Sequence, residues 1–416
     1  MRLLNTRTLA LEIFPSEDGR PKYAILSHTW GSDEIIYNDV KLGPENLLNS
    51  KEGLSKVIQS AKRAQVDGYD YIWIDTCCID KSSSAELSEA INSMFRWYQD
   101  SAICYVFLAD YGHPDPSVHK PDLGLGSQFA GSRWFTRGWT LQELIAPGVV
   151  RFFDPNWRFV GDRRDLAVEI AQITTIEVTV LAREFGTRKF GTWTVISARE
   201  ILRACSTSRK MSWASQRRTT RVEDLAYCLL GIFDLNMPLL YGEGDRAFIR
   251  LQEQIARNFH DQTLLAWHNP STWYVGDRSN IFAPSPSCFH KSGQFRPAQY
   301  VSEVSLMTLT GRGLELDVHL APCTLHCSTE PKRRIRGQFA AGVLSCGDGA
   351  DEFSCVGLLL ERADTQDDSY IVIREIHGSI ISPLRICSGV KKVDIFEGKS
   401  ITGQYHCYVS SGHANL

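Results

Sequence analysis

The feature that most constrains the fold is an alternation of short apolar runs with helical stripes across the first 154 residues. Four runs rich in β-branched and aromatic residues have the length of strands: 23–26, 71–74, 103–108 and 149–153. Helical segments separate them, such as Leu54–Ala61 and the helix that Ser83 and Glu86 open with capping-box spacing. This order predicts an α/β fold with a parallel sheet and helices on both faces, because such strands are apolar along their whole length.

Polar residues stand where each predicted strand ends. Ser27 and His28 follow the first strand, Asp75 the second, Asp110 the third and Asp154 the fourth. The carboxyl ends of parallel strands share one edge of an open sheet, and ligands bind outside that edge. The sequence therefore predicts a ligand site at this edge.

Length and charge limit the classes of protein to consider. At 416 residues the chain suggests two or three domains. Hydrophobic residues at 43% and charged residues at 22% are ordinary for a globular protein. A formal net charge of -3 gives no general attraction to nucleic acid or to an anionic membrane, so neither is an expected partner.

The cysteines and the apolar stretches indicate the compartment. The first residues lack the apolar run of a signal peptide, and no stretch is long and apolar enough to span a bilayer. Twelve cysteines follow no regular spacing and include no CxxC pair, which argues against a disulfide framework and against a structural zinc site. We expect a cytoplasmic protein with no metal site.

Beyond residue 162 the pattern changes twice. Residues 163–269 are mainly helical, and short alternating segments from residue 270 onward predict an antiparallel, β-rich module. We therefore expect domains at 1–162, 163–269 and 270–416. Gly242 and Gly244 precede a helical stripe, but they follow no strand, so a turn with Asp245 at the helix start is favoured over a phosphate loop.

An acidic residue among tryptophans and arginines marks the stretch 132–144. Residues 139–146 suit one or two helical turns, which Pro147 ends. Glu143 cannot share the apolar face of these turns fully, so we expect it on a flank, near Arg133 and Arg137. It is either a structural ion-pair partner of one of these arginines or a reacting group.

Three blocks together resemble the heterokaryon incompatibility (HET) domain of filamentous fungi: 23–31, 73–80 and 137–144. The later blocks 221–233 and 241–244 are similar to the helical extension that often follows this domain, so the resemblance covers about the first 270 residues. It implies a role in non-self recognition and regulated cell death. Some members continue into nucleotide-binding and repeat regions, and neither pattern occurs in this sequence. The expectation is an effector that self-associates on activation by an unknown protein trigger.

A second resemblance, to TIR domains, bears on mechanism. Leu26-Ser27, Ile74-Asp75 and the motif 139–144 match TIR positions, with Thr140 where TIR domains usually have cysteine. The resemblance implies a TIR-like (flavodoxin-like) sheet. In TIR domains that hydrolyse NAD the glutamate of this motif is catalytic, and that role falls on Glu143.

Cleavage of NAD at the nicotinamide–ribose bond builds positive charge on the ribose, which a carboxylate in a water-poor site stabilises as it forms. We therefore expect Glu143 to be catalytic and NAD to be the substrate, with no cofactor. Substrate-binding roles are expected for six residues. Ser27 and His28 would contact ribose or phosphate, Trp30 or Trp139 would stack on the nicotinamide ring, and Asp75 and Arg137 complete the set.

Structural roles compete with these assignments. His28 is also explained as a packed loop histidine that donates to a backbone carbonyl, and Asp75 and Asp80 as caps of the turn after the second strand. Trp134 and Trp139 are more typical of a core than of a ligand platform.

Two further alternatives concern function. Cys77 or Cys78 paired with His28 would make a nucleophile, but a thiolate needs an activating partner that the sequence does not supply. The chain as a whole is either an NAD-hydrolysing effector or a non-catalytic signalling module that acts by self-assembly and partner binding.

Overall fold

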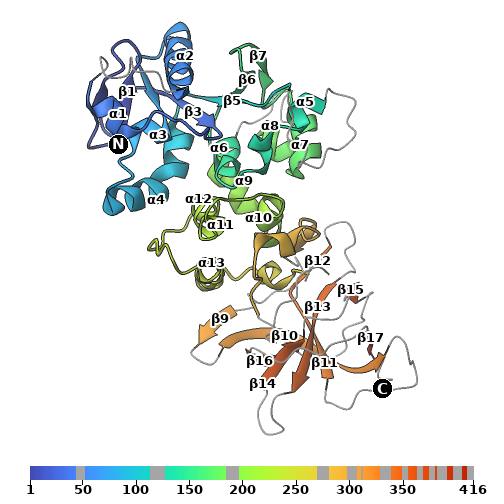
Figure 1. Cartoon of the computed structure of the whole chain (residues 1–416). Helices are drawn as coiled ribbons and strands as arrows, with labels where there is room; N and C mark the ends of the chain where they lie inside the picture. Colours follow the sequence, from blue (N-terminus) through green and yellow to red (C-terminus); the bar gives the residue numbers. More distant parts are fainter. Residues whose placement is uncertain are drawn as a thin grey trace. The chain divides into compact units, whose positions relative to one another are not determined.

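The computed structural model groups the residues into two compact units (Figure 1). The first unit comprises Met1–Ala204 and Arg217–Gly242, and the second comprises Cys205–Gln216 and Glu243–Leu416. The chain therefore leaves and re-enters the first unit. The structure describes residues 1–43, 52–112, 127–183, 196–268, 281–297, 307–310, 313–327, 339–348, 355–362, 369–373, 380–381, 391–396 and 405–409.

A seven-stranded sheet forms the centre of the first unit, in the order β2-β1-β4-β3-β5-β6-β7. The four central strands are parallel to one another, which confirms the α/β class and the flavodoxin-like order expected from the sequence. They are β3 (Ala24–His28), β4 (Tyr71–Trp73), β5 (Ile103–Phe107) and β6 (Val150–Phe153). Their side chains are almost all buried, as expected for strands that are covered on both faces.

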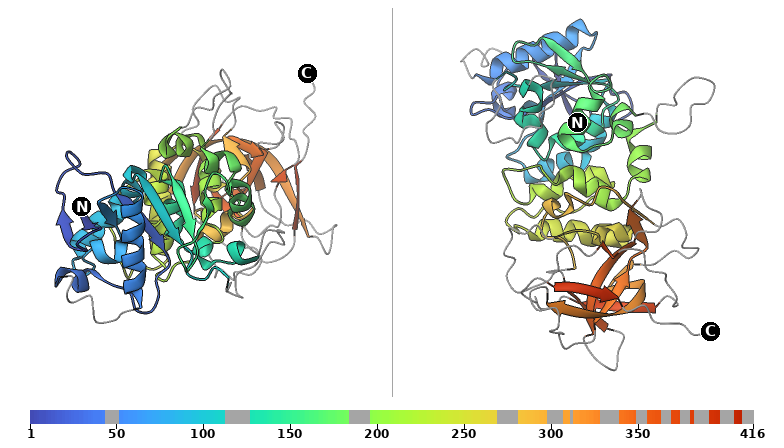
Figure 2. Two further views of the ribbon diagram at one scale, coloured as in Figure 1. Left: turned by 90° about the horizontal axis from the view of Figure 1, so that it is seen from above. Right: turned by 90° about the vertical axis from the view of Figure 1, so that its right-hand side faces the viewer.

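The two longest helices of this unit cover opposite faces of the sheet (Figure 2). Helix α2 (Gly53–Val66) connects β3 to β4, and α4 (Ser84–Asp100) connects β4 back past β3 to β5. Right-handed crossovers that run in opposite directions place their helices on opposite faces. The hydroxyl of Ser83 accepts from the N–H of Glu86, so the predicted start of α4 is confirmed.

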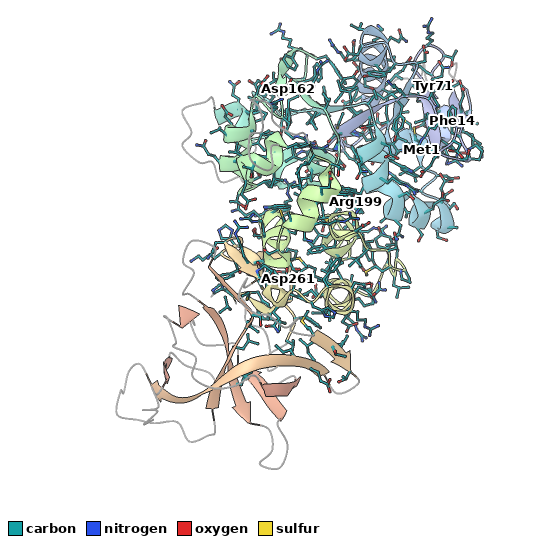
Figure 3. The ribbon with its side chains drawn as sticks, turned by 180° about the vertical axis from the view of Figure 1, so that it is seen from behind. Met1, Phe14, Tyr71, Asp162, Arg199 and Asp261 are labelled. Atoms are coloured by element: carbon teal, nitrogen blue, oxygen red, sulfur yellow. The ribbon has the colours of Figure 1, made fainter. Side chains whose placement is uncertain are left out.

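Short antiparallel strands, which the sequence patterns did not predict, extend both edges of this sheet. Strand β1 (Arg2–Asn5) pairs with β4 and with β2 (Leu11–Ile13), and β7 (Phe159–Asp162) pairs with β6. Phe14 and Tyr71 meet edge to face with ring centroids 5.3 Å apart, which anchors the end of β2 (Figure 3). These strands are three or four residues long, too short to form a recognisable apolar run.

Short helices complete the first unit: α1 (Tyr37–Lys41), α3 (Asp75–Cys78), α5 (Ser127–Ala130), η2 (Arg133–Thr136), α6 (Thr140–Ile145), α7 (Ala167–Thr174), α8 (Val178–Ala182), α9 (Ala198–Ala204), α11 (Asp224–Tyr227) and α12 (Leu230–Phe233). Helix α6 packs against α4, and α12 packs against α4 through Gly231, which leaves no room for a Cβ beside Phe95. The segment 217–242 is thus part of this unit's core.

The second unit combines helices with a mainly antiparallel sheet. Its helical elements are α10 (Thr207–Ala214), α13 (Arg246–Asn258), η3 (Gln262–Leu265) and η4 (Pro286–Phe289). Asp245 occupies the residue before α13, where the sequence placed the helix start. The boundaries expected at residues 162 and 269 stay predictions.

The predicted β-rich character from residue 270 onward is confirmed in the described segments. Its strands are β8 (Phe295–Pro297), β9 (Met307–Thr310), β10 (Gly313–Cys327), β11 (Phe339–Val343), β12 (Cys346–Asp348), β13 (Cys355–Arg362), β14 (Ser369–Ile373), β15 (Ile380–Ile381), β16 (Lys391–Phe396) and β17 (Tyr405–Val409). Only β14 and β16 pair in parallel among these strands. In the described parts of both units no helix is long and apolar enough to cross a membrane.

Candidate functional site

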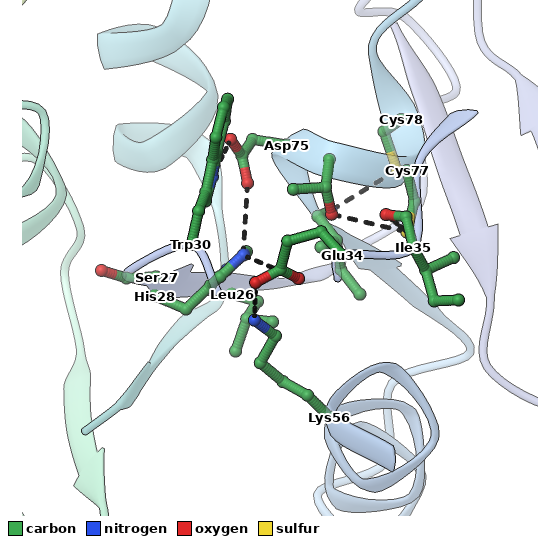
Figure 4. A network of polar contacts seen from close by, with 12 residues as sticks. Leu26, Ser27, His28, Trp30, Glu34, Ile35, Lys56, Asp75, Cys77 and Cys78 are labelled. Carbon is green, nitrogen blue, oxygen red and sulfur yellow. Dashed lines mark hydrogen bonds and ion pairs between the residues drawn. The ribbon is translucent and has the colours of Figure 1, made fainter. Parts of the chain in front are cut away.

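The end of β3 sends two neighbouring side chains to opposite faces of the sheet. Successive residues of a strand alternate between faces, so Ser27 and His28 cannot serve the same pocket. Ser27 faces the side of α4 and α6, and His28 faces the side of α2 (Figure 4). The predicted site at the carboxyl edge therefore consists of two clusters of residues.

The first cluster, here called the Glu143 pocket, consists of Glu143, Ser27, Trp134 and Tyr98. Glu143 lies on α6 and is only 7% exposed. The Ser27 hydroxyl donates to Oε2 of Glu143 at 2.5 Å, and the Trp134 indole Nε1 donates to the Ser27 hydroxyl at 2.8 Å. The hydroxyl is thereby held in one orientation, with its proton directed at the carboxyl group.

Burial controls the protonation of Glu143. Loss of solvation raises the pKa of Glu143 to about 8, the nearby charge of Asp75 adds to this rise, and the hydrogen bond from Ser27 opposes it. The carboxyl group is therefore mostly protonated at pH 7. A carboxyl group with a pKa in this range is suited to proton transfer near neutral pH.

The predicted ion pair of Glu143 with Arg133 or Arg137 is wrong for the described residues. Arg133 donates to the backbone carbonyl of Trp30 at 3.1 Å, and Arg137 donates to the hydroxyl of Thr220 at 3.0 Å. Glu143 does not lie on an open flank either, because α6 packs against both α4 and β3 and the residue is buried.

A different arginine approaches Glu143 from the segment that re-enters the unit. Arg217 is buried and donates to the carbonyl of Arg137 at 2.8 Å and to the hydroxyl of Thr140 at 2.9 Å. Its charge lowers the pKa of Glu143, although burial and Ser27 act more strongly. Thr140, which stands where TIR domains usually have cysteine, thus links α6 to this arginine.

The second cluster, here called the His28 cluster, consists of His28, Glu34, Lys56 and Asp75 (Figure 4). Nε2 of His28 lies 3.8 Å from a carboxylate oxygen of Glu34 and 3.8 Å from one of Asp75. Lys56 of α2 pairs with the other oxygen of Glu34 at 2.5 Å. Burial lowers the pKa of His28 to about 3, so its imidazole is neutral at pH 7.

His28, Asp75 and Asp80 differ in whether they play the structural role expected from the sequence. No hydrogen bond joins a ring nitrogen of His28 to any described residue, so the expected donation to a backbone carbonyl is absent from this part of the chain. The Asp80 carboxylate accepts from the N–H and hydroxyl of Ser82 and therefore caps the turn as expected. Asp75 instead accepts from the indole Nε1 of Trp30 at 3.0 Å.

The adjacent cysteines are poorly placed for nucleophilic chemistry. Cys77 and Cys78 are buried in α3, and burial raises the pKa of both thiols. Cys77 donates to the carbonyl of Ile35 rather than to His28. Thiols in this state are protonated at neutral pH and are inert.

The two candidate stacking residues differ in accessibility. Trp30 is 52% exposed, whereas Trp139 is half-buried and hydrogen-bonds to Asp224. Lys81 lies over the Trp30 ring, with Nζ 3.5 Å from its centroid. Trp134 is fully buried, which confirms its expected place in the core.

The remaining strand-end acids serve local structure. Asp110 accepts from the hydroxyl of Ser132 and the N–H of Arg133, and Asp154 accepts from the N–H groups of Asn156 and Arg158. Of the acids at this edge, only Asp75 affects the Glu143 pocket, through its charge. No group of metal-ligating side chains within the described ranges is arranged to hold a metal ion.

Comparison with known proteins shows which families two parts of this chain resemble. Strands β3, β4 and β5 lie within residues 23–121, which match the family described as Heterokaryon incompatibility protein (HET). This stretch of the chain is therefore similar to HET domains. Residues 246–311 match a second family, described as a domain of unknown function (DUF8212).

A particular relative is the vegetative incompatibility protein HET-E-1 of Podospora anserina, which is 46% identical over 265 residues. This match covers 62% of the chain but 18% of the relative, so the chain spans less than a fifth of that protein's length. No solved structure matches the chain.

Proposed function

We propose that this chain acts in heterokaryon incompatibility as an effector of regulated cell death, and that its first unit hydrolyses NAD at the nicotinamide–ribose bond. The observation that carries the proposal is the buried carboxyl of Glu143. It lies at the carboxyl edge of a parallel sheet, receives the Ser27 hydroxyl, and has a pKa raised to about 8 by burial.

The proposed hydrolysis has three steps: bond cleavage, stabilisation of the ribose cation, and addition of water. The bond between C1′ of the ribose and the nicotinamide nitrogen breaks, and its electron pair neutralises the pyridinium ring. Positive charge then develops on the ribose, where Glu143 stabilises it in the fraction of molecules in which this carboxyl is ionised, a fraction that grows as pH rises toward 8. A water oxygen adds to C1′, and one proton of that water passes to Glu143 and then to solvent, leaving ADP-ribose and nicotinamide. Ser27 keeps the carboxyl oriented throughout.

Access to the pocket has to be gated. Glu143 is nearly covered, so substrate can reach it only after α6 or the loops at the sheet edge move. Self-association on activation would supply that movement, which fits an effector that is silent until triggered.

The test is nicotinamide release from NAD by the purified chain, both free and forced to oligomerise through a fused oligomerisation tag. Glu143→Gln preserves size and hydrogen bonding but removes the ionisable group, and we expect release to fall by at least about a hundredfold. The matched control Glu89→Gln changes an exposed glutamate of α4 and should keep full activity. Full activity in Glu143→Gln would reject the catalytic role.

A second candidate is a non-catalytic signalling module that acts by self-assembly. The burial of Glu143 and its bond to Ser27 favour this candidate, because a buried and satisfied carboxyl also stabilises a core. If the oligomerised wild type leaves NAD intact and still causes death when expressed, and Glu143→Gln does the same, the assembly function is supported instead.

A further inference from the structure

Trp30 forms a half-exposed platform next to the His28 cluster, to which its bond to Asp75 connects it (Figure 4). It follows the buried residues His28 and Thr29, and yet its ring is 52% exposed. Its Nε1 donates to Asp75 at 3.0 Å, and this hydrogen bond fixes the orientation of the ring. A fixed aromatic surface of this kind can receive an aromatic or sugar group with little loss of conformational entropy.

Two cations from separate loops lie against this tryptophan. Lys81, which follows α3, places Nζ over the ring, and it approaches Asp75 at 3.6 Å. Arg133, at the start of η2, is exposed and donates to the backbone carbonyl of Trp30. Neither residue was selected for binding from the sequence, because they are far apart in the chain.

The carboxylates nearby offset the charge of Lys81 but not that of the Arg133 guanidinium. Asp75 is shared between Lys81 and Trp30, Glu34 is held by Lys56, and Asp110 accepts from the backbone of Arg133. Among the described residues no carboxylate pairs with the Arg133 guanidinium. At Trp30, Arg133 is therefore a cation whose guanidinium is free of carboxylates in the described part of the chain, whereas Lys81 shares Asp75.

The charges of Lys81 and Arg133 decide which part of a ligand fits against Trp30. A cationic ring such as nicotinamide would compete with Lys81 for the aromatic face and would be repelled by it. A diphosphate would be attracted, with Lys81 as a point charge and Arg133 offering its planar fork. An adjoining base or sugar would lie on the exposed indole.

The platform and the Glu143 pocket belong to one edge of the sheet. Ser27 of the pocket is three residues before Trp30, and Asp75 contacts Trp30 while its charge acts on Glu143. A ligand with a ribose at Glu143 would place its diphosphate outside that pocket, over the platform.

We propose that Trp30, Lys81 and Arg133 form a subsite for a nucleoside diphosphate group. This deepens the proposed function and rests on it for the identity of the whole substrate. The subsite recognises the ADP-ribose portion of NAD, and the nicotinamide ring lies elsewhere.

The test is calorimetric titration of the full chain with ADP-ribose, which requires no catalysis. Lys81→Met and Arg133→Gln should each weaken binding about tenfold, the effect expected for losing one hydrogen bond to a charged group. Trp30→Leu should weaken it similarly, and Lys81→Arg should restore most of the affinity. The control Lys62→Met, at an exposed position of α2, should bind as wild type does. Melting curves show which variants are folded.

Two partial ligands separate the contributions. Inorganic pyrophosphate should bind wild type but lose affinity in Lys81→Met and Arg133→Gln, while remaining insensitive to Trp30→Leu. Adenosine should bind more weakly than ADP-ribose, and its affinity should depend on Trp30 alone. Binding of ADP-ribose to wild type should also weaken as salt is raised.

The outcomes distinguish this subsite from the hydrolysis. Failure of wild type to bind ADP-ribose at millimolar concentration, or unchanged binding in folded Lys81→Met and Arg133→Gln, overturns the subsite even if NAD is cleaved. Binding that depends on these residues, without any release of nicotinamide, supports the subsite and rejects the hydrolysis.

Discussion

Glu143 differs from an ordinary exposed glutamate in two ways. It is buried, and a neighbouring serine directs a proton at it. The sequence selected Ser27 because it follows a predicted strand, and Glu143 because it is the glutamate of the motif 139–144. It could not select Trp134 or Arg217 as their partners, since those contacts depend on how distant segments pack.

The raised pKa of Glu143 predicts a pH-dependent stability. The ordinary value is 4.5 and the folded value is about 8, so between these limits the folded chain binds more protons than the unfolded chain. Stability from this group is therefore complete below pH 4.5 and is lost as pH rises toward 8. Relative to Glu143→Gln, the wild type should lose about 1.4 kcal/mol of unfolding free energy per pH unit across this window.

Urea unfolding of both proteins at pH 5, 7 and 9 measures this difference. The comparison with Glu143→Gln cancels the opposite contribution of His28, whose pKa is lowered by burial. A constant difference between the two proteins at all three values of pH would mean that Glu143 is ionised throughout.

At the scale of single elements, α6 is held by two buried arginines at its carboxyl end. Arg163 donates to the carbonyls of Leu144, Pro147 and Gly148. Arg183 donates to those of Ile145, Ala146 and Pro147. These carbonyls have no partner within the helix, and cations favour that end of the helix dipole. The helix that carries Glu143 is thus fixed from outside.

We predict that Arg163→Met lowers the free energy of unfolding by about 2–4 kcal/mol, because it leaves buried carbonyls without donors. Arg164→Met, at the exposed neighbouring position, should change it by less than about 0.5 kcal/mol. Chemical denaturation of both variants provides the measurement. Equal effects would show that the contacts of Arg163 do not secure α6.

The predictability of the elements follows their length and burial. Strands β3, β4, β5 and β6 were predicted within one or two residues, because continuous apolar runs mark strands that are covered on both faces. The edge strands β1, β2 and β7 were not predicted, since pairing with a neighbour, rather than an apolar pattern, defines them.

At the scale of the whole molecule, the chain crosses between its two units more than once. Residues 217–242 return to the first unit, where the N–H of Gly138 donates to the carbonyl of Arg218 at 2.9 Å. A Cβ on Gly138 would lie 2.5 Å from Thr219, so this close approach requires glycine. Compositional shifts along a sequence cannot reveal such a return, which is why the expected boundaries were placed without it.

This return predicts unequal stability of two fragments. A fragment ending at residue 162 lacks Arg163, Arg183 and Arg217, all of which donate to α6 or its flanks. A fragment ending at residue 242 retains them. We expect the shorter fragment to melt at a lower temperature or to be unfolded, as judged by circular dichroism. Equal melting temperatures would establish residues 1–162 as an independent domain.

The alternation of Ser27 and His28 has a consequence for natural variation. A one-residue insertion or deletion between Ala24 and His28 would exchange their faces, setting an imidazole against Glu143 and a hydroxyl among the charges of the opposite cluster. A point substitution in this strand alters either the Glu143 pocket or the His28 cluster, whereas a change in length alters both at once. Functional alleles should therefore differ in this strand by substitution and never by length, while the surrounding loops are free to vary in both.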